Sequence, residues 1–297
     1  LDTDKPVVTP DGTASTDVDR TDTDEPDAPG RTRREYCYNI LVSGLDDDNG
    51  GSDTNILVRF DVPNKRIDLV SLPRDTLLHN EYRNNKLNFA YAKGGTELLM
   101  SQIENLLGVP VDFYVTVNLK GFIALVDQID GVDFDIPINM DYDDPYQDLH
   151  IHFTKGPRHL NGQEAMEVVR FRHNNDGTGY GTEDIGRIGT QQAFLKAVAK
   201  QLLQIGNVKN IPALVDIFYT YVKTDLTTGN LVWLGNEALN IGTENIHFAT
   251  LPGDGSGYYN KQSVYVLDAQ ATCDLVNEAL NPYNEALTLE DMDILVP

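Results

Sequence analysis

Short runs of apolar residues alternate with stretches of helical spacing along the first part of the folded chain. The runs are rich in Val, Ile, Phe and Tyr and are bounded by turn residues, a pattern that predicts strands. The predicted strands are residues 38–43, 55–61, 66–72, 112–118 and 132–136. Two stretches of helical spacing, 95–107 and 119–129, end at Gly108 and Gly131 and are predicted helices.

The second half of the chain is mostly helical in its pattern. Periodic stretches predict helices at 161–170, 186–205 and 228–240, and residues 246–251 form one more strand-like run. Strands that alternate with helices, followed by a mostly helical region, indicate an α/β fold: an α-β-α sandwich around a central mixed β-sheet. Residues 173–183 contain three Gly and two Asn, which is typical of a mobile loop.

Residues 1–34 are rich in Asp, Thr and Pro and nearly free of large apolar side chains. Such a segment cannot bury enough apolar surface to offset its chain entropy, so we expect a disordered acidic linker. The folded domain is then expected over residues 35–297. The sequence has no run of about 18 apolar residues and begins with polar and acidic residues, so neither a transmembrane helix nor a signal peptide is predicted within it.

The formal net charge of the chain is −23, from 23 basic and 46 acidic residues. This balance argues against a nucleic-acid-binding protein, whose affinity depends on Lys and Arg paired with phosphates. The negative charge of the protein would repel an anionic small ligand, so such a ligand could bind only where several Arg and Lys side chains lie close together. The positions of the few basic residues are therefore informative.

The chain has two cysteines, Cys37 and Cys273, which are too few for a disulfide framework or a four-ligand metal site. Two buried free thiols and one long-range disulfide are both compatible with the sequence. A thiol nucleophile is not favoured, because Cys37 has no histidine near it in the sequence.

Four groups of polar residues follow predicted strands or helices, and the first group is acidic. Asp46, Asp47 and Asp48 come directly after the first predicted strand, and Asp53 follows shortly afterwards. Carboxylates at a strand end suit a hard divalent cation such as Mg²⁺, which prefers oxygen ligands. An acidic surface loop would have the same composition, so this group alone leaves both interpretations open.

The second and third groups contain basic residues. Arg74 and Asp75 follow a predicted strand, where an Arg can bind a phosphate through two parallel hydrogen bonds. The alternative is an Arg–Asp surface pair, worth ~0–1 kcal/mol. Lys86 precedes Gly94 and Gly95 at a predicted helix start, where free N–H groups suit an anion.

The fourth group lies in the second half of the chain. Arg170 and Arg172 are separated by one Phe and would share one face of a strand-like segment, whereas in a helix they would diverge by about 200°. Beyond the predicted loop, Asp184 and Arg187 lie near the start of the next helix, followed by Gln191. Each of the four groups is weak by itself, but their combination is specific.

The order and spacing of these groups resemble the LytR-CpsA-Psr family of cell-wall transferases. The resemblance extends from about Tyr38 to Gln192, and more loosely to Gly253. It depends on the motifs G-L-D at 44–46, D-T-N at 53–55, S-L-P-R-D at 71–75, K-L-N-F-A-Y at 86–91, R-F-R at 170–172, and D-I-G-R at 184–187 with Q-Q at 191–192.

The resemblance implies a membrane-anchored domain on the extracellular face of a bacterial membrane, with its anchor helix upstream of these residues. It implies transfer of a phosphoglycopolymer such as teichoic acid from undecaprenyl pyrophosphate to a peptidoglycan hydroxyl, with Mg²⁺ or Mn²⁺ as cofactor. The implied metal ligands are Asp46 and Asp53. The implied catalytic residues are Arg74, Asp75, Asp184 and Arg187. The implied substrate-binding residues are Lys86, Arg170, Arg172 and Gln191.

Within this set the resemblance implies different roles for cations and carboxylates. The Arg and Lys side chains would neutralise the two phosphates. Asp75 or Asp184 would orient the arginines or accept the proton of the attacking sugar hydroxyl. One position departs from the family pattern, because Thr190 stands where the family usually has a second Arg. This missing positive charge bears on the strength of pyrophosphate binding.

Two other functions are compatible with the same residues. A lipid pyrophosphatase would use water as the acceptor, and a non-catalytic wall- or lipid-binding module would bind without turnover. A P-loop nucleotide site is not favoured, because the chain has no GxxxxGK[ST]. His150 and His152 share one face of a possible strand and could form a zinc pair, but without a third ligand an exposed strand is the preferred interpretation.

Overall fold

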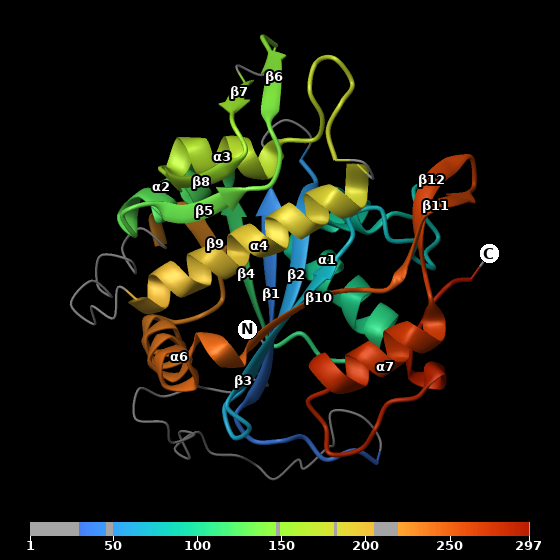
Figure 1. Ribbon diagram of the computed structural model, residues 1–297. Helices are drawn as coiled ribbons and strands as arrows, with labels where there is room; N and C mark the ends of the chain where they lie inside the picture. The colour runs from blue at the N-terminus through green and yellow to red at the C-terminus, as the bar shows by residue number, and fades with distance from the viewer. Residues whose placement is uncertain (1–29, 46–49, 147–148, 181–182, 205–218, 297) are drawn as a thin grey trace. The chain divides into compact units, whose positions relative to one another are not determined.

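The computed structural model, drawn in Figure 1, describes residues 30–45, 50–146, 149–180, 183–204 and 219–296. The chain separates into two compact units. The first contains the chain up to Asn118 and from Val222 onward, and the second contains Leu119 to Tyr221. The predicted domain over residues 35–297 therefore consists of two units, the second inserted in sequence within the first.

A six-stranded mixed sheet forms the centre of the first unit. Its strands are β1 (Cys37–Leu45), β2 (Ser52–Asp61), β3 (Arg66–Leu72), β4 (Phe113–Asn118), β9 (Val222–Thr224) and β10 (Ile246–Thr250). They lie in the order β10-β3-β2-β1-β4-β9. β1 is parallel to β4 and β3 to β10, whereas β2 is antiparallel to both of its neighbours and β9 to β4. The predicted central mixed sheet is confirmed.

One edge of this sheet collects the ends of several strands. β1, β3, β4 and β10 run in one direction, so their carboxyl ends meet at one edge, which we call the carboxyl edge. Because β2 runs in the opposite direction, its first residues reach the same edge. The β2–β3 ladder pairs Asn55 with Leu72 and Arg59 with Asp68. Arg59 and Asp68 form a buried ion pair, with 2.7 Å between nitrogen and oxygen.

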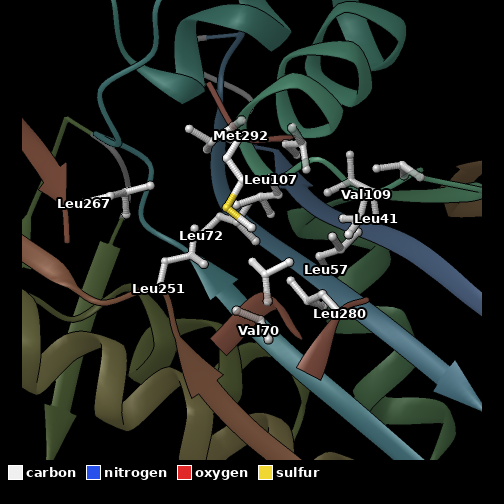
Figure 2. Packing of buried hydrophobic residues seen from close by; sticks show 14 of the residues in the cluster. Leu41, Leu57, Val70, Leu72, Leu107, Val109, Leu251, Leu267, Leu280 and Met292 are labelled. Carbon is white, nitrogen blue, oxygen red and sulfur yellow. The ribbon is translucent and has the colours of Figure 1, made fainter. Parts of the chain in front are cut away.

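Helices cover both faces of the sheet. They are α1 (Leu87–Leu107), α6 (Thr228–Ile241) and α7 (Ala269–Ala279). α1 and α7 pack on one face, and Figure 2 shows the core beneath them, to which Leu41 and Leu57 of two neighbouring strands and Leu107 of α1 belong. α6 packs on the opposite face, where Trp233 meets Tyr38 edge to face with ring centroids 6.1 Å apart. The first unit is an α-β-α sandwich, as the sequence predicts.

The end of the predicted linker is held against the rest of the first unit by two ion pairs. Arg33 forms an ion pair with the buried carboxylate of Asp112, and Arg34 pairs with buried Asp61 at 3.1 Å. A buried carboxylate that loses its partner costs several kcal/mol, so these arginines hold this short stretch against the fold. The remainder of the predicted linker, residues 1–29, lies outside the described residues. In the described part, no helix has both the length and the apolar character needed to cross a bilayer.

The second unit contains helices and two separate two-stranded sheets. Its elements are α2 (Leu119–Gln128), β5 (Val132–Ile136), β6 (Met140–Asp144), β7 (Leu149–Phe153), β8 (Gly156–Leu160), α3 (Gly162–Arg170) and α4 (Glu183–Gln204). β5 pairs with β8 and β6 with β7, both antiparallel. Phe171 and Phe194 are fully buried in the core that these elements share.

Several elements differ from the prediction. α1 begins at Leu87, well before the predicted start, and its backbone leaves helical geometry at Gly94 and Gly95, where Gly95 has a φ of 67°. Of β6, β7 and β8, the sequence indicates only the exposed strand around His150 and His152, which lies within β7, whereas β6 and β8 are not predicted. The hairpin formed by β11 (Gly253–Tyr259) and β12 (Gln262–Leu267) is not predicted either.

Both cysteines are buried and unbonded, so the structure has free thiols rather than a long-range disulfide. Burial raises the pKa of the Cys37 thiol to about 11, and burial also raises the pKa of Cys273. A thiol with a raised pKa and no access to solvent is a poor nucleophile. Neither cysteine is therefore a candidate for the chemistry.

Candidate functional site

Asp53 and Arg74 meet at the carboxyl edge of the first unit. Asn55 of β2 pairs with Leu72, the last residue of β3. Asp53 lies two residues before Asn55 in β2, and Arg74 lies in the turn that begins after Leu72. The Arg74 guanidinium donates a hydrogen bond from Nη1 to Oδ1 of Asp53. The strand register therefore brings together two residues that the sequence predicts as a metal ligand and a phosphate-binding cation.

Asp75 and Lys86 extend this pair into a row of alternating charges. The Lys86 ammonium lies 3.1 Å from Oδ1 of Asp75, and Nε of Arg74 lies 3.8 Å from the same oxygen. We call Asp53, Arg74, Asp75 and Lys86 the charge cluster. Each cation in it is held by a carboxylate, so the cations are oriented before any ligand arrives.

The backbone around the charge cluster is fixed by hydrogen bonds. The Pro73 carbonyl accepts from the amide and the hydroxyl of Thr76, which makes a tight turn around Arg74. The Arg74 carbonyl accepts from the amide of Asn88 in the first turn of α1. These bonds tie the end of β3 to the start of α1, so the two segments that carry Arg74 and Lys86 stay in register with each other.

The charge cluster is accessible to a ligand. The side chains of Lys86, Arg74, Asp53 and Asp75 are 21%, 30%, 33% and 41% exposed. Ion pairs at this exposure contribute only ~0–1 kcal/mol to stability. A phosphate could therefore replace a carboxylate as the partner of Arg74 or Lys86 at small energetic cost.

Two buried oxygens beside the charge cluster have no hydrogen-bond partner among the described residues. They are Oγ of Ser52, next to Asp53 in β2, and Oδ1 of Asn88, whose amide binds Arg74. A buried polar atom without a partner costs about 1–3 kcal/mol, and a bound water or ion is one explanation for such an atom. Both atoms are oxygens, as are the donors of the Asp53 carboxylate, and oxygen is the donor type that Mg²⁺ prefers, so the residues present are compatible with this ion.

Ser52 is not among the site residues predicted from the sequence, and Asn88 belongs there only to the K-L-N-F-A-Y motif. Ser52 and Asn55 are buried polar residues at the start of β2, ahead of the buried apolar residues Ile56 and Leu57, and this polar stretch is the signal that could have identified them. Asp46, the other predicted metal ligand, lies outside the described residues.

The R-F-R segment of the second unit is not strand-like. Arg170 is the last residue of α3, and Phe171 leaves helical geometry with a φ of −58° and a ψ of 132°. Phe171 is buried and meets Tyr180 with ring centroids 5.6 Å apart. The prediction of one strand face for both arginines is wrong, because burial of the intervening Phe ends the helix between them. Arg170 is half-buried and Arg172 is exposed.

The beginning of α4 carries the remaining predicted site residues. Asp184 and Arg187 belong to this helix, but their side chains lie outside the described part of the structure. Gln191 donates from Nε2 to the Val169 carbonyl at 3.3 Å, which links α4 to the end of α3. Thr190 is buried, and its hydroxyl donates to the Gly186 carbonyl at 3.1 Å within the helix.

The loop between α3 and α4 is hydrogen-bonded to β6 where the structure describes it. The Asn174 and Asn175 side-chain oxygens accept from the amides of Asp141 and Asp143 at 2.7 and 2.6 Å. The Asn175 amide group also donates to the Asp143 carbonyl at 3.1 Å. The two asparagines that suggested a loop in the sequence therefore have a structural role, as side chains that cap the edge of a strand.

Comparison with known proteins identifies relatives of the chain. The model of the LytR_cpsA_psr family matches residues 9–281. The polyisoprenyl-teichoic acid–peptidoglycan teichoic acid transferase TagU of Bacillus cereus is 32% identical over 244 residues, which are 80% of this chain and 76% of TagU. The corresponding transferase TagV of Bacillus subtilis is 31% identical over 248 residues, which are 79% of this chain and 61% of TagV.

The fold is also similar to a solved structure. The crystal structure of Bacillus subtilis TagV superimposes with a TM-score of 0.71 at 26% sequence identity. The match covers 89% of this chain and all of the TagV chain in that structure. The family resemblance seen in the motifs and the predicted fold class are both confirmed.

Two glycines of α4 give a paired prediction about packing around the D-I-G-R motif. A Cβ at Gly186 would lie 2.3 Å from Cβ of Tyr180, whereas a Cβ at Gly189 would meet nothing within 4 Å. Gly186→Ala is therefore expected to destabilise the protein by about 1–3 kcal/mol through overpacking. Gly189→Ala is expected to stabilise it by up to about 1 kcal/mol through helix propensity. Urea unfolding followed by circular dichroism measures both, and equal effects of the two substitutions would contradict the proposed packing.

Proposed function

Because the chain belongs to the LytR-CpsA-Psr family, we propose that it transfers a phosphoglycopolymer from undecaprenyl pyrophosphate to a hydroxyl group of peptidoglycan. The names of the two relatives, which describe transfer of teichoic acid from a polyisoprenyl carrier to peptidoglycan, support this proposal. The observation that carries it is the charge cluster, which gathers Arg74 and Lys86 at an accessible sheet edge of a protein with a net charge of −23. In such a protein a pyrophosphate can bind only where cations converge.

The reaction needs charge neutralisation more than covalent help from the protein. The acceptor oxygen attacks the phosphorus that carries the glycopolymer, the bond from this phosphorus to the bridging oxygen breaks, and undecaprenyl phosphate leaves. The acceptor hydroxyl loses its proton in the same process. Arg74 and Lys86 would bind the non-bridging oxygens and stabilise the charge that develops on the leaving phosphate. Their prior orientation by Asp53 and Asp75 reduces the reorganisation that this requires.

We propose that Mg²⁺ or Mn²⁺ assists this reaction. Asp53 would hold the ion together with Asp46, and the buried oxygens of Ser52 and Asn88 would complete or support the ligand set. When bound, the ion would withdraw charge from the pyrophosphate oxygens. Arg74 would then exchange its contact with Asp53 for a contact with phosphate, which the exposure of this pair permits.

The contacts of Asp75 favour a positioning role. Its carboxylate lies within 4 Å of both cations of the charge cluster, at 3.1 Å from Lys86 and 3.8 Å from Arg74. A carboxylate in this place fixes the directions of two phosphate-binding groups. Acceptance of the proton from the sugar hydroxyl, by Asp75 or by Asp184, is the alternative role for a carboxylate here.

The second unit would contribute further positive charge to substrate binding. We propose that Arg170, Arg172 and Arg187 bind anionic groups of the substrate and that Gln191 adds a neutral hydrogen-bond donor. Thr190 adds none, because its hydroxyl donates to a helix carbonyl. We also propose that the domain works on the extracellular face of the membrane, held by an upstream anchor, because the peptidoglycan acceptor is found there.

The central role of Arg74 can be tested against a second arginine. Arg74→Ala is expected to lower the rate of polymer transfer by about 10²–10³-fold, as loss of one transition-state donor does elsewhere. Arg83→Ala, which removes an exposed arginine from the loop before Lys86, is expected to leave the rate unchanged. The assay follows attachment of a labelled lipid-linked polymer to peptidoglycan fragments. Release of free polymer without attachment would identify a lipid pyrophosphatase instead, and equal rates for both variants would contradict the proposed site.

Asp75→Asn separates the two roles of this carboxylate. As a positioning residue, Asp75 supports both cations, so the variant is expected to raise KM about tenfold, which corresponds to about 1.4 kcal/mol of binding, and to keep most of kcat. The measurement is steady-state kinetics of transfer at varied lipid substrate. A fall in kcat of about 10²–10⁴-fold with unchanged KM would assign general-base catalysis to Asp75.

Metal dependence is tested by removal of divalent ions. Treatment with EDTA is expected to abolish transfer, and added Mg²⁺ or Mn²⁺ is expected to restore it. Asp53→Asn should raise the Mg²⁺ concentration for half-maximal activity at least about tenfold, because a neutral amide replaces a charged oxygen ligand. The control is Asp274→Asn on the exposed side of α7, which should respond to Mg²⁺ as the unaltered protein does. Full activity in EDTA would overturn this part of the proposal.

A further inference from the structure

The hairpin of β6 and β7 in the second unit carries four polar side chains on one exposed face. Its register pairs Asp141 with His152 and Asp143 with His150. Side chains alternate between the two faces of a strand, and in β7 the residues between and beside the histidines are buried while both histidines are exposed. The two histidines therefore stand on the same face, directly opposite the two aspartates.

Three of these side chains have the spacing of a metal site. The ligand atoms of Asp143, His150 and His152 all lie within 4.8 Å of one another. Oδ1 of Asp143 is 2.5 Å from Nδ1 of His150 and 3.4 Å from Nε2 of His152. Zn²⁺ binds His nitrogen and Asp oxygen at about 2.0–2.2 Å, so an ion can be placed among atoms with this separation after small side-chain rotations. The cross-strand Asp143 supplies the third ligand that the sequence pattern of His150 and His152 lacks.

A second observation points independently to a metal ligand. Nδ1 of His152 lies 2.8 Å from Oδ1 of Asp141, while its Nε2 faces Asp143. A histidine that binds a metal through one ring nitrogen commonly donates the other N–H to a carboxylate, which fixes the tautomer and the ring orientation. Asp141 occupies the place of this supporting carboxylate, so the lone pair of His152 Nε2 is directed toward the proposed ion.

The backbone beneath these side chains is held in place by the loop that follows α3. Asn174 and Asn175 accept hydrogen bonds from the amides of Asp141 and Asp143 at 2.7 and 2.6 Å. A free edge strand of a two-stranded hairpin would otherwise leave these amides to solvent. The loop therefore restricts the positions of both carboxylates, which favours a preformed arrangement.

We propose that Asp143, His150 and His152 bind a divalent transition-metal ion, for which Zn²⁺ is the representative, with Asp141 supporting His152. Two imidazoles and one carboxylate suit Zn²⁺ and its neighbours rather than Mg²⁺, which prefers oxygen ligands. Three protein ligands leave a fourth position to water. This site lies wholly in the second unit, and it does not depend on the proposed transferase activity.

The chain offers a matched control in the neighbouring two-stranded sheet. There Asp133 of β5 pairs with His159 of β8, and His159 Nδ1 lies 2.8 Å from Asp133 Oδ1. This pair repeats the cross-strand His–Asp contact on an exposed surface but contains only one imidazole. A metal ion that needs two histidine ligands is therefore not expected to bind the Asp133–His159 pair.

The test is a calorimetric titration of the full chain with ZnCl₂, in millimolar MgCl₂ to occupy oxygen-only sites. One Zn²⁺ per chain is expected to bind, and His150→Ala and His152→Ala should each weaken this binding at least about 100-fold. Asp141→Asn should weaken it about tenfold, as loss of a supporting carboxylate does. His159→Ala and Arg74→Ala should bind Zn²⁺ as the unaltered protein does, and circular dichroism confirms that every variant is folded.

Two outcomes would overturn the proposal. One is the absence of Zn²⁺ binding by the unaltered protein under these conditions. The other is binding that His150→Ala and His152→Ala reduce no more than His159→Ala does. Imidazole NMR signals provide a separate readout, because only those of His150 and His152 are expected to shift on addition of one equivalent of Zn²⁺. Since none of these measurements uses transferase activity, failure here is distinguishable from failure of the proposed function.

Discussion

The buried ion pair between Arg59 and Asp68 determines how β2 aligns with β3. The two residues are directly paired in the ladder, and both side chains are almost completely buried. A slip of one residue would leave the buried Arg59 guanidinium without its carboxylate, although Asp68 would keep its contact with Arg66 of the same strand. Removal of one partner from a buried pair costs about 3–5 kcal/mol. The same slip would turn Asp53 to the other face of the sheet, away from Arg74. The candidate site thus depends on a contact in the middle of the strands, some residues away from the charges that it aligns.

Ion pairs in the first unit fall into two classes with different consequences. Arg59–Asp68 and the pair of Arg34 with Asp61 contain buried carboxylates that no solvent can stabilise. The pairs of the charge cluster are partly exposed, so water can compensate for their loss. A cation that must exchange its carboxylate partner for a phosphate needs to be in a partly exposed pair, because only there is the loss of the carboxylate inexpensive. Charges that are buried within the sheet therefore have a structural role, and the partly exposed charges at the carboxyl edge are available for a functional one.

Much of the fold could be predicted from the sequence, because apolar periodicity records which faces of the strands and helices are buried. β1 to β5, α2, α3 and α6 were located within a few residues in this way. β6 was not, and β7 was indicated only as an exposed strand around His150 and His152, because the exposed faces of both strands carry Asp and His and only single apolar residues remain between them. At the site, strand ends identified Asp53 and Arg74, but whether the oxygens of Ser52 and Asn88 are buried without partners depends on packing that no local pattern records.

The R-F-R and D-I-G-R motifs of the second unit show why a motif's small and apolar residues are as informative as its charged ones. Phe171 packs on Tyr180, and Tyr180 lies so close to Gly186 that a side chain there would collide with it. The two motifs are therefore joined by a single stack, with Tyr180 between them. Thr190, one turn beyond Gly186, is buried, and its hydroxyl donates a hydrogen bond to the Gly186 carbonyl. An arginine at that position would need to carry its charge out of a buried place, so the first turns of α4 are adapted to packing at the position where the family resemblance implied a second cation.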